Sequence, residues 1–467
     1  MANKKSNLMK NTILLSLGTM MTKGLNFVMV PFFSRWVSTA DYGTFDVFCT
    51  YITLMIPIVT MSSGDAIFRF SVESDRKEDK SIYITNGLAI DFFGLLLFSL
   101  ALAGASYFGG WERAFPFWTL LLGEVISRYE RGYLRAIKRL DIYSFCNFIS
   151  AIGIAVFVTV FVRVFNMGLD GMIYGYAAGY LLGDLLIFVF TNYIHYFNPK
   201  TISWKVVSEM LRFSIPLVPN NLSWWVINVS DRTIINRILG AAANGIYAMS
   251  YKVPNLCSSV FSVFGVAWQE KATEMLDDKG KNKYYNNVFN KMLATGISIT
   301  IAITSVNFIL FNYIFDYKYF EGRLYAPLLT LSVIMSTLSL FFGGIQISMK
   351  QSKSNGISTV IGAIVNIVVH LTLVEFIGLY AACISTLISN IMVVCIRAYM
   401  IRDAVKLRID SVNYVYILIC VYITACVYLM NNFAWNIANL VIATVVFLFA
   451  NRKYVISTAE KIKVIKR

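Results

Sequence analysis

The sequence predicts an all-α membrane protein that crosses the bilayer about 14 times, with both ends on the cytoplasmic side. Hydrophobic residues make up 57% of the 467 positions and charged residues only 14%, whereas soluble domains average about 45–50% and about 25%. The apolar residues gather in runs, and a helix that spans the bilayer needs about 20 of them in succession. The basic residues lie in short clusters between the runs, which is the pattern that orients membrane proteins.

The first apolar run, 11–34, follows a basic N-terminus. It is longer than the apolar region of a signal peptide, which has about 7–15 residues, so we expect a retained helix. Five runs after it predict the other helices of a first half, at 44–64, 82–108, 115–134, 142–162 and 170–194. Eight more runs predict the rest, at 213–230, 244–266, 286–312, 324–347, 355–374, 378–400, 412–430 and 433–450.

The distribution of charge tests this count. When the connections are assigned alternately to the two sides, beginning inside, 32 of the 41 Lys and Arg residues fall on the inner side and 8 on the outer side. Basic residues are enriched in cytoplasmic loops, so the asymmetry predicts an even number of helices and cytoplasmic ends. The net charge of +15 is therefore topological, and because no recognition motif accompanies it we expect no nucleic-acid partner.

The chain also contains an internal echo. Arg35 is followed eight positions later by a glycine and two positions after that by an aromatic residue, and Arg237 repeats this pattern 202 residues on. The segments are Arg35 with Gly43 and Phe45, and Arg237 with Gly245 and Tyr247. Gly64-Asp-Ala66 and Gly265-Val-Ala267 recur at an offset of 201. We interpret these matches as a duplication of a six-helix unit.

Six is an even number, so the two copies have the same orientation and form parallel repeats about an axis along the membrane normal. We expect two six-helix lobes, at 1–200 and 201–408, that face a central cleft. Residues 409–467 then hold two extra helices and a basic tail. This is the plan of a transporter whose cleft opens alternately to either side.

Several motifs resemble one known family. They are Asp41–Phe45, Gly64–Phe70, Ser230–Ile235, Leu239-Gly240 and Gly245–Pro254. The chain resembles the polysaccharide-biosynthesis (O-antigen flippase type) family of the multidrug/oligosaccharidyl-lipid/polysaccharide exporter superfamily. The resemblance implies a multi-pass flippase of the bacterial cytoplasmic membrane. It would move an undecaprenyl-pyrophosphate-linked oligosaccharide between leaflets, among membrane lipid and alongside a glycan polymerase and glycosyltransferases.

A pyrophosphate group that crosses hydrocarbon needs cations around it. Lys23 lies near the middle of its predicted helix, too far from either end to reach water easily, and Lys252 lies just before Pro254. A charge at a helix centre costs about 2.5–3.5 kcal/mol, so it normally faces a wet cavity or a partner. We therefore expect Lys23 and Lys252 in the cleft, with a structural ion pair or snorkelling towards the interface as the alternative.

Further basic candidates lie at helix ends. Arg232 and Arg237 follow Asp231 at the outer end of the run at 213–230, where contact with substrate and a lobe-closing ion pair are equally open. Arg128 and Arg131 belong to a basic run whose spacing of three to four stacks them on one helix face. The run either provides ordinary positive-inside charge or captures phosphate, which Arg binds through two hydrogen bonds.

Acidic residues within the apolar runs are candidates for binding a coupling Na⁺ or proton. Asp91 and Asp184 are the strongest of these, ahead of Asp46 and Glu375, and His370 is a weaker candidate for proton relay. Pairing with a nearby Arg or Lys is the alternative. The seven cysteines form no CxxC pair and only two His are present, so we expect no metal site and no cofactor.

No catalytic constellation or ATPase motif is visible, so we expect a protein that is not an enzyme. Three functions remain: the lipid-linked oligosaccharide flippase, a cation-coupled multidrug exporter of the same architecture, and a non-transporting scaffold or glycan polymerase. Cations in the cleft favour an anionic substrate over the organic cations of a multidrug exporter. A polymerase would be expected to carry a long loop outside the membrane, and no such loop is apparent.

Overall fold

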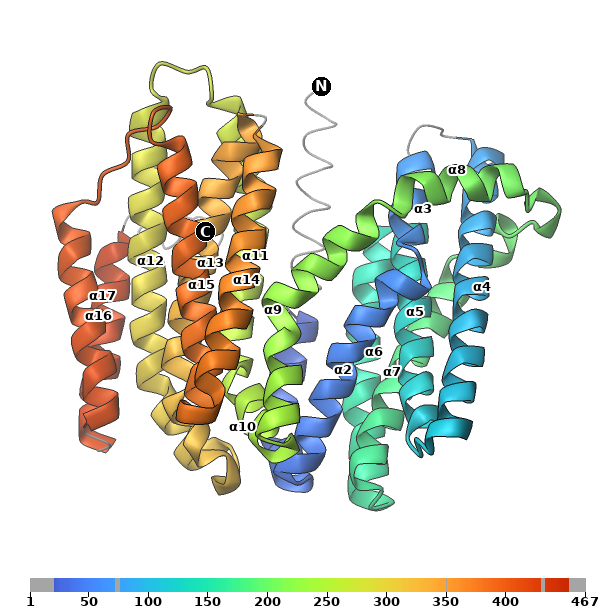
Figure 1. The fold of residues 1–467 in the computed structure, drawn as a ribbon, viewed down its shortest axis with the longest axis horizontal. Coiled ribbons are helices and arrows are strands. Elements are labelled where there is room, and N and C mark those ends of the chain that lie inside the picture. Colours follow the sequence, from blue (N-terminus) through green and yellow to red (C-terminus); the bar gives the residue numbers. More distant parts are fainter. Residues whose placement is uncertain (1–20, 72–75, 350, 430–432, 453–467) are drawn as a thin grey trace, which may run out of the picture. The chain divides into compact units, whose positions relative to one another are not determined.

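The computed structural model describes residues 21–71, 76–349, 351–429 and 433–452 (Figure 1). A helix covers 21–36, while 11–20 of the first predicted run and the basic ends of the chain lie outside the described residues. The long helices that follow are α2 (Thr39–Val59), α4 (Lys77–Gly109), α5 (Ala114–Ala136), α6 (Leu140–Val158), α7 (Gly168–Phe190), α9 (Leu217–Ile238), α11 (Lys252–Glu274), α12 (Lys281–Ile309), α13 (Ala326–Ser348), α14 (Ser352–Ile377), α15 (Leu379–Ile401), α16 (Ser411–Leu429) and α17 (Phe433–Ala450).

Shorter helices connect the long ones. They are α3 (Ser63–Ser71), η1 (Thr159–Val164), η2 (Tyr193–Tyr196), η3 (Pro199–Thr201), α8 (Trp204–Ser214), α10 (Ala241–Ser250), η4 (Leu310–Ile314) and η5 (Tyr317–Leu324). Eight helices of the described residues are long and apolar enough to cross a membrane. The expectation of an all-helical, multi-pass membrane protein is confirmed, and most described residues of each predicted apolar run are helical.

Three runs end or break differently from the expectation. The run at 213–230 is interrupted at 215–216, between α8 and α9. The run at 44–64 corresponds to α2, which starts earlier and stops at Val59 before the short α3. The run at 244–266 is interrupted at Tyr251, between α10 and α11. Pro254 explains the interruption at Tyr251, because it has no N–H to donate to the carbonyl of Ser250 and is tolerated only in the first turn of a new helix.

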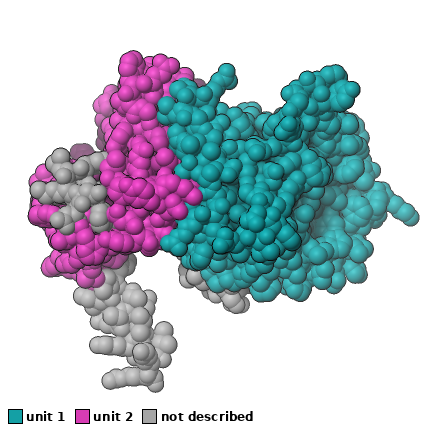
Figure 2. All heavy atoms as spheres, turned by 90° about the horizontal axis from the view of Figure 1, so that it is seen from below, with its two compact units in different colours: residues 1–245 teal, residues 246–467 magenta. Residues whose placement is uncertain are grey.

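Contacts divide the chain into two units, residues 1–245 and 246–467 (Figure 2). In the first unit α7 packs along α6 and α5, and α9 packs against α2. This contact groups α9 with the first unit, although the sequence places the boundary between predicted lobes near residue 200. A buried cluster that includes Tyr133, Met210 and Cys146 fills the end of this unit where α3, α5 and α8 meet.

The second unit has its own core, in which Trp268 stacks on Phe341 with ring centroids 4.5 Å apart. Helix α12 also carries a ladder of asparagines. Asn286 and Asn290 each donate a side-chain hydrogen bond to a backbone carbonyl of 406–410, and each accepts one from a backbone N–H of that segment. The ladder fixes the extended connection between α15 and α16, and α12 in turn packs against α16 and α17.

Candidate functional site

A polar cavity of about 350 Å³ lies in the first unit, where α2, α3, α4, α5 and the start of α9 meet. Small-molecule sites generally have volumes of about 300–1,000 Å³. We call it the arginine cavity because it is lined by Arg128, Arg131 and Arg135. The other lining residues are Thr53, Ile56, Pro57, Thr60, Ser62, Ser63, Gly64, Asp65, Asp91, Tyr129, Gly132 and Asn221.

The three arginines lie on one face of α5 because residues three and four positions apart are neighbours on a helix. Arg131 donates from Nε to the Tyr143 hydroxyl at 2.8 Å. Arg135 forms a 3.6 Å ion pair with Asp65, and the two side chains are 36% and 53% exposed. Arg128 is exposed and makes no side-chain hydrogen bond or ion pair with the described residues. At least one guanidinium is therefore available to an anion.

The opposite wall is a tight turn between α2 and α3. Met61 and Ser62 have φ values of 48° and 55°, a left-handed conformation that is uncommon for residues other than glycine. The turn brings Ser62, Ser63 and the N-terminal end of α3 to the cavity, and a helix N-terminus carries a partial positive charge. Gly132 of α5 approaches α3 so closely that a Cβ there would lie 2.7 Å from the Cα of Gly64. The absence of a side chain at Gly64 and Gly132 therefore allows α3 and α5 to pack closely.

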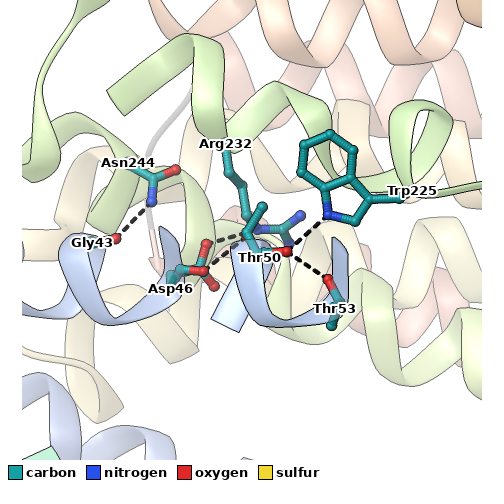
Figure 3. Close-up of polar contacts among 7 residues, drawn as sticks. All are labelled: Gly43, Asp46, Thr50, Thr53, Trp225, Arg232 and Asn244. Atoms are coloured by element: carbon teal, nitrogen blue, oxygen red, sulfur yellow. Dashed lines mark hydrogen bonds and ion pairs between the residues drawn. The ribbon is translucent and has the colours of Figure 1, made fainter. Parts of the chain in front are cut away.

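A second polar cluster joins α2 to α9 (Figure 3). Nε of Arg232 lies 2.7 Å from Oδ2 of Asp46, and the two side chains are only 13% and 16% exposed. Trp225 donates from Nε1 to the carbonyl of Thr50 at 2.8 Å. Arg232, a predicted cleft cation, thus has a carboxylate partner, which is the ion-pair alternative considered from the sequence.

The same cluster brings together the two glycines of the internal echo. A Cβ on Gly43 would lie 1.8 Å from the carbonyl oxygen of Ala241, and a Cβ on Gly245 would lie 2.0 Å from that of Thr39. Gly43 and Gly245 are 202 positions apart, and so are Thr39 and Ala241, so each glycine contacts the residue that is equivalent to the partner of the other. Asn244 donates from Nδ2 to the carbonyl of Gly43 at 2.9 Å and ties the crossing together (Figure 3).

The remaining predicted residues lie elsewhere. Lys23 is partly buried in the helix at 21–36, and Arg237 is exposed at the end of α9. Neither lines the arginine cavity. Lys252 begins α11 in the second unit. Asp184 is 7% exposed on α7 and accepts a hydrogen bond from Ser127 at 2.8 Å.

Two buried charged residues were not singled out from the sequence. Glu130 lies within the basic run of α5, yet it is 7% exposed and close enough to Asp184 for the two carboxyl groups to interact electrostatically. Arg397 is 5% exposed within α15. Its position inside the run at 378–400 was the available signal.

The Arg397 guanidinium connects three helices. Nη1 donates to the carbonyl and hydroxyl of Ser339 on α13, while Nε and Nη2 donate to Ser358 and Thr359 on α14. Among the described residues no group of three or more His, Cys, Asp or Glu side chains could hold a metal ion.

Solved structures share this fold at low sequence identity. The lipid II flippase MurJ, in an inward closed conformation, is 16% identical with a TM-score of 0.69, over 96% of this chain and 100% of that one. An inward-facing multidrug resistance MATE family transporter of the MOP superfamily is 14% identical with a TM-score of 0.60, over 83% and 94%. The Vibrio cholerae MATE transporter VcmN is 11% identical with a TM-score of 0.58, over 88% and 98%.

Among proteins of curated function, none matches the sequence significantly. Residues 8–269, more than half of the chain, match the family described as Polysaccharide biosynthesis protein. The match confirms the resemblance indicated by the motifs. The chain belongs to the Polysaccharide biosynthesis protein family and has the fold of the MurJ and MATE transporters.

Proposed function

We propose that the protein is a flippase that moves an undecaprenyl-pyrophosphate-linked oligosaccharide across the bacterial cytoplasmic membrane by alternating access. The observation that carries this proposal is the arginine cavity, in which three guanidinium groups share one polar space with the N-terminal end of α3. A pyrophosphate diester carries two negative charges, and Arg binds phosphate oxygens through two parallel hydrogen bonds. The cavity has the charge and donors that such a headgroup needs on leaving water.

The partners of the arginines define their roles in this proposal. Arg128 binds the headgroup first, because its side chain has no hydrogen bond or ion pair with the described residues that must break. Arg131 keeps its hydrogen bond to Tyr143 through Nε and has its terminal nitrogens left for phosphate. Arg135 exchanges its long, partly exposed ion pair with Asp65 for the headgroup, at little cost because ion pairs near the surface contribute about 0–1 kcal/mol.

The topology is part of the proposal. Fourteen spans with cytoplasmic ends place the arginine cavity at the cytoplasmic side, where a lipid-linked glycan is loaded. The lobes at 1–200 and 201–408 and the added pair at 409–467 follow the internal echo. The Asp46–Arg232 pair then lies towards the outer side. Lys23, Lys252 and Arg237 provide cations farther along the path, and a glycan polymerase and glycosyltransferases act before and after translocation.

The proposal is tested in cells whose surface glycan depends on this protein. Arg128→Gln and Arg131→Gln, alone and together, are compared at matched protein level with Arg139→Gln. Arg139 belongs to the same basic run but does not line the cavity. Its hydrogen bond to Asp141 holds the pKa of the Arg139 guanidinium above its ordinary value.

We expect the double variant to lose surface glycan and to accumulate the lipid-linked intermediate, while Arg139→Gln behaves as the wild type. Undiminished surface glycan in the double variant would remove these arginines from the mechanism.

A further inference from the structure

Asp91 contributes a buried carboxyl group to the arginine cavity. The residue is 3% exposed, and its Oδ1 accepts a hydrogen bond from the Ser63 hydroxyl at 2.5 Å. Its Oδ2 has no hydrogen-bond partner, and Asp91 forms no ion pair with the described residues. The cavity therefore contains an acid whose second oxygen faces no donor, although three arginines line the same space.

The charged and titratable groups around Asp91 come from several elements. Arg128, Arg131 and Arg135 line the cavity from α5, together with Tyr129, and Asp65 lines it from α3. Tyr193 of η2 is close enough for its hydroxyl to interact electrostatically with Asp91. Asp65 already pairs with Arg135, so Asp91 is the lining carboxyl group that lacks a cationic partner among the described residues.

An unpaired carboxylate is costly in a buried site, and the addition of a proton removes this cost. An anion in the same cavity increases the cost of the carboxylate form because like charges in a low-dielectric space repel. The neutral acid does not repel the anion, and its O–H becomes a donor directed into the cavity. Protonation of Asp91 and binding of an anion therefore favour each other.

We propose that binding of the pyrophosphate headgroup in the arginine cavity is coupled to the uptake of one proton by Oδ2 of Asp91. The inference rests on the proposed function and deepens it, because it adds a second ligand to the same site. The proton comes from the aqueous phase that opens to the cavity, and it returns to water when the headgroup leaves. Neutral Asp91 admits the headgroup and ionised Asp91 excludes it, and by linkage each ligand raises the affinity for the other.

The test measures binding of geranyl-pyrophosphate-linked glucose to the purified full chain in detergent. This probe is a pyrophosphate diester, and its own charge stays constant between pH 5 and pH 8. Calorimetry in two buffers of different ionisation enthalpy gives the number of protons taken up. We expect the wild type to take up protons on binding, at most one per probe. Its affinity should fall as the pH rises, by about tenfold per pH unit at most.

Asp91→Asn imitates the neutral acid and keeps an acceptor for Ser63. It should bind the probe tightly, with no pH dependence and no proton uptake. Asp184→Asn is the matched control, because Asp184 is also a buried acid but does not line the cavity. It should keep the proton uptake of the wild type. Ser63→Ala removes the hydrogen bond that stabilises the Asp91 carboxylate, so its affinity for the probe should begin to fall at a higher pH than that of the wild type.

The outcomes separate the two proposals. A wild type that binds the probe at constant affinity without proton uptake overturns the coupling and leaves the flippase proposal standing. Proton uptake that persists in Asp91→Asn also overturns the coupling. A wild type that does not bind the probe at any pH overturns the assignment of the headgroup site itself.

Discussion

Substitution of Gly43 by alanine tests the close contact between α2 and α10. The new Cβ would lie 1.8 Å from the carbonyl oxygen of Ala241, whereas ordinary contact begins at 3.4 Å, so α2 and α10 must move apart by more than an ångström. Overpacking of this kind costs about 1–3 kcal/mol, and loss of the hydrogen bond from Asn244 adds about 1 kcal/mol. We therefore expect a destabilisation of about 2–4 kcal/mol.

Thermal unfolding of the purified protein, followed by tryptophan fluorescence, measures this effect. A loss of 1 kcal/mol lowers Tm by about 2–4 °C in a unit of 150–250 residues, so Gly43→Ala should lower Tm by at least about 4 °C. Gly245→Ala should act similarly, since its Cβ would lie 2.0 Å from the carbonyl oxygen of Thr39. Gly104→Ala is the control because nothing lies within 4 Å of its Cβ. Equal Tm values for Gly43→Ala and Gly104→Ala would refute the close crossing.

Two further substitutions test other contacts. Arg397→Lys should lower Tm, because lysine cannot reproduce the planar fork that connects α13, α14 and α15, and each unmade buried hydrogen bond costs about 1–3 kcal/mol. Arg402→Lys, at an exposed site, should leave Tm unchanged, and equal losses in the two variants would contradict this role of Arg397. Gly132→Ala should weaken binding of the pyrophosphate probe although every arginine is retained, because its Cβ would push α3 away from α5. Unchanged affinity would show that the spacing of the cavity walls does not matter.

The membrane fold could be predicted because its physical requirement is local. Hydrocarbon demands about 20 consecutive apolar residues in each helix, and this signal was strong enough to locate α5 despite Glu124 and Arg128. The basic face of α5 could also be predicted, because helical spacing alone places Arg128 and Arg131 together.

The contacts between side chains of different helices could not be predicted from the spacing of residues in the sequence. Asp46 and Arg232 are far apart in the sequence, and only the packing of α9 on α2 makes them partners. Glu130 illustrates the same limit, because a carboxylate beside a basic run resembles a solvated surface residue until the packing of α7 on α5 buries it. The turn at Met61 and Ser62 has no glycine to signal its left-handed backbone.

Gly43 and Gly245 could be predicted only in part from the sequence. The echo at an offset of 202 residues identified both glycines, but it did not indicate that they touch. This contact is what our interpretation of the echo as a parallel repeat would lead one to expect, because equivalent segments near a symmetry axis meet each other. The missing side chains at both positions allow the two backbones to approach as closely as the structure shows.

Translocation in reconstituted vesicles tests the central claim most directly. A fluorescent undecaprenyl-pyrophosphate-linked oligosaccharide is incorporated with the purified protein, and a membrane-impermeant quencher reports how fast glycan in the inner leaflet becomes accessible outside. We predict rapid translocation by the wild type and by Arg139→Gln, and a rate no faster than that of protein-free vesicles for the double variant Arg128→Gln, Arg131→Gln. Translocation by the double variant at the rate of the wild type, or none by the wild type itself, would contradict the account.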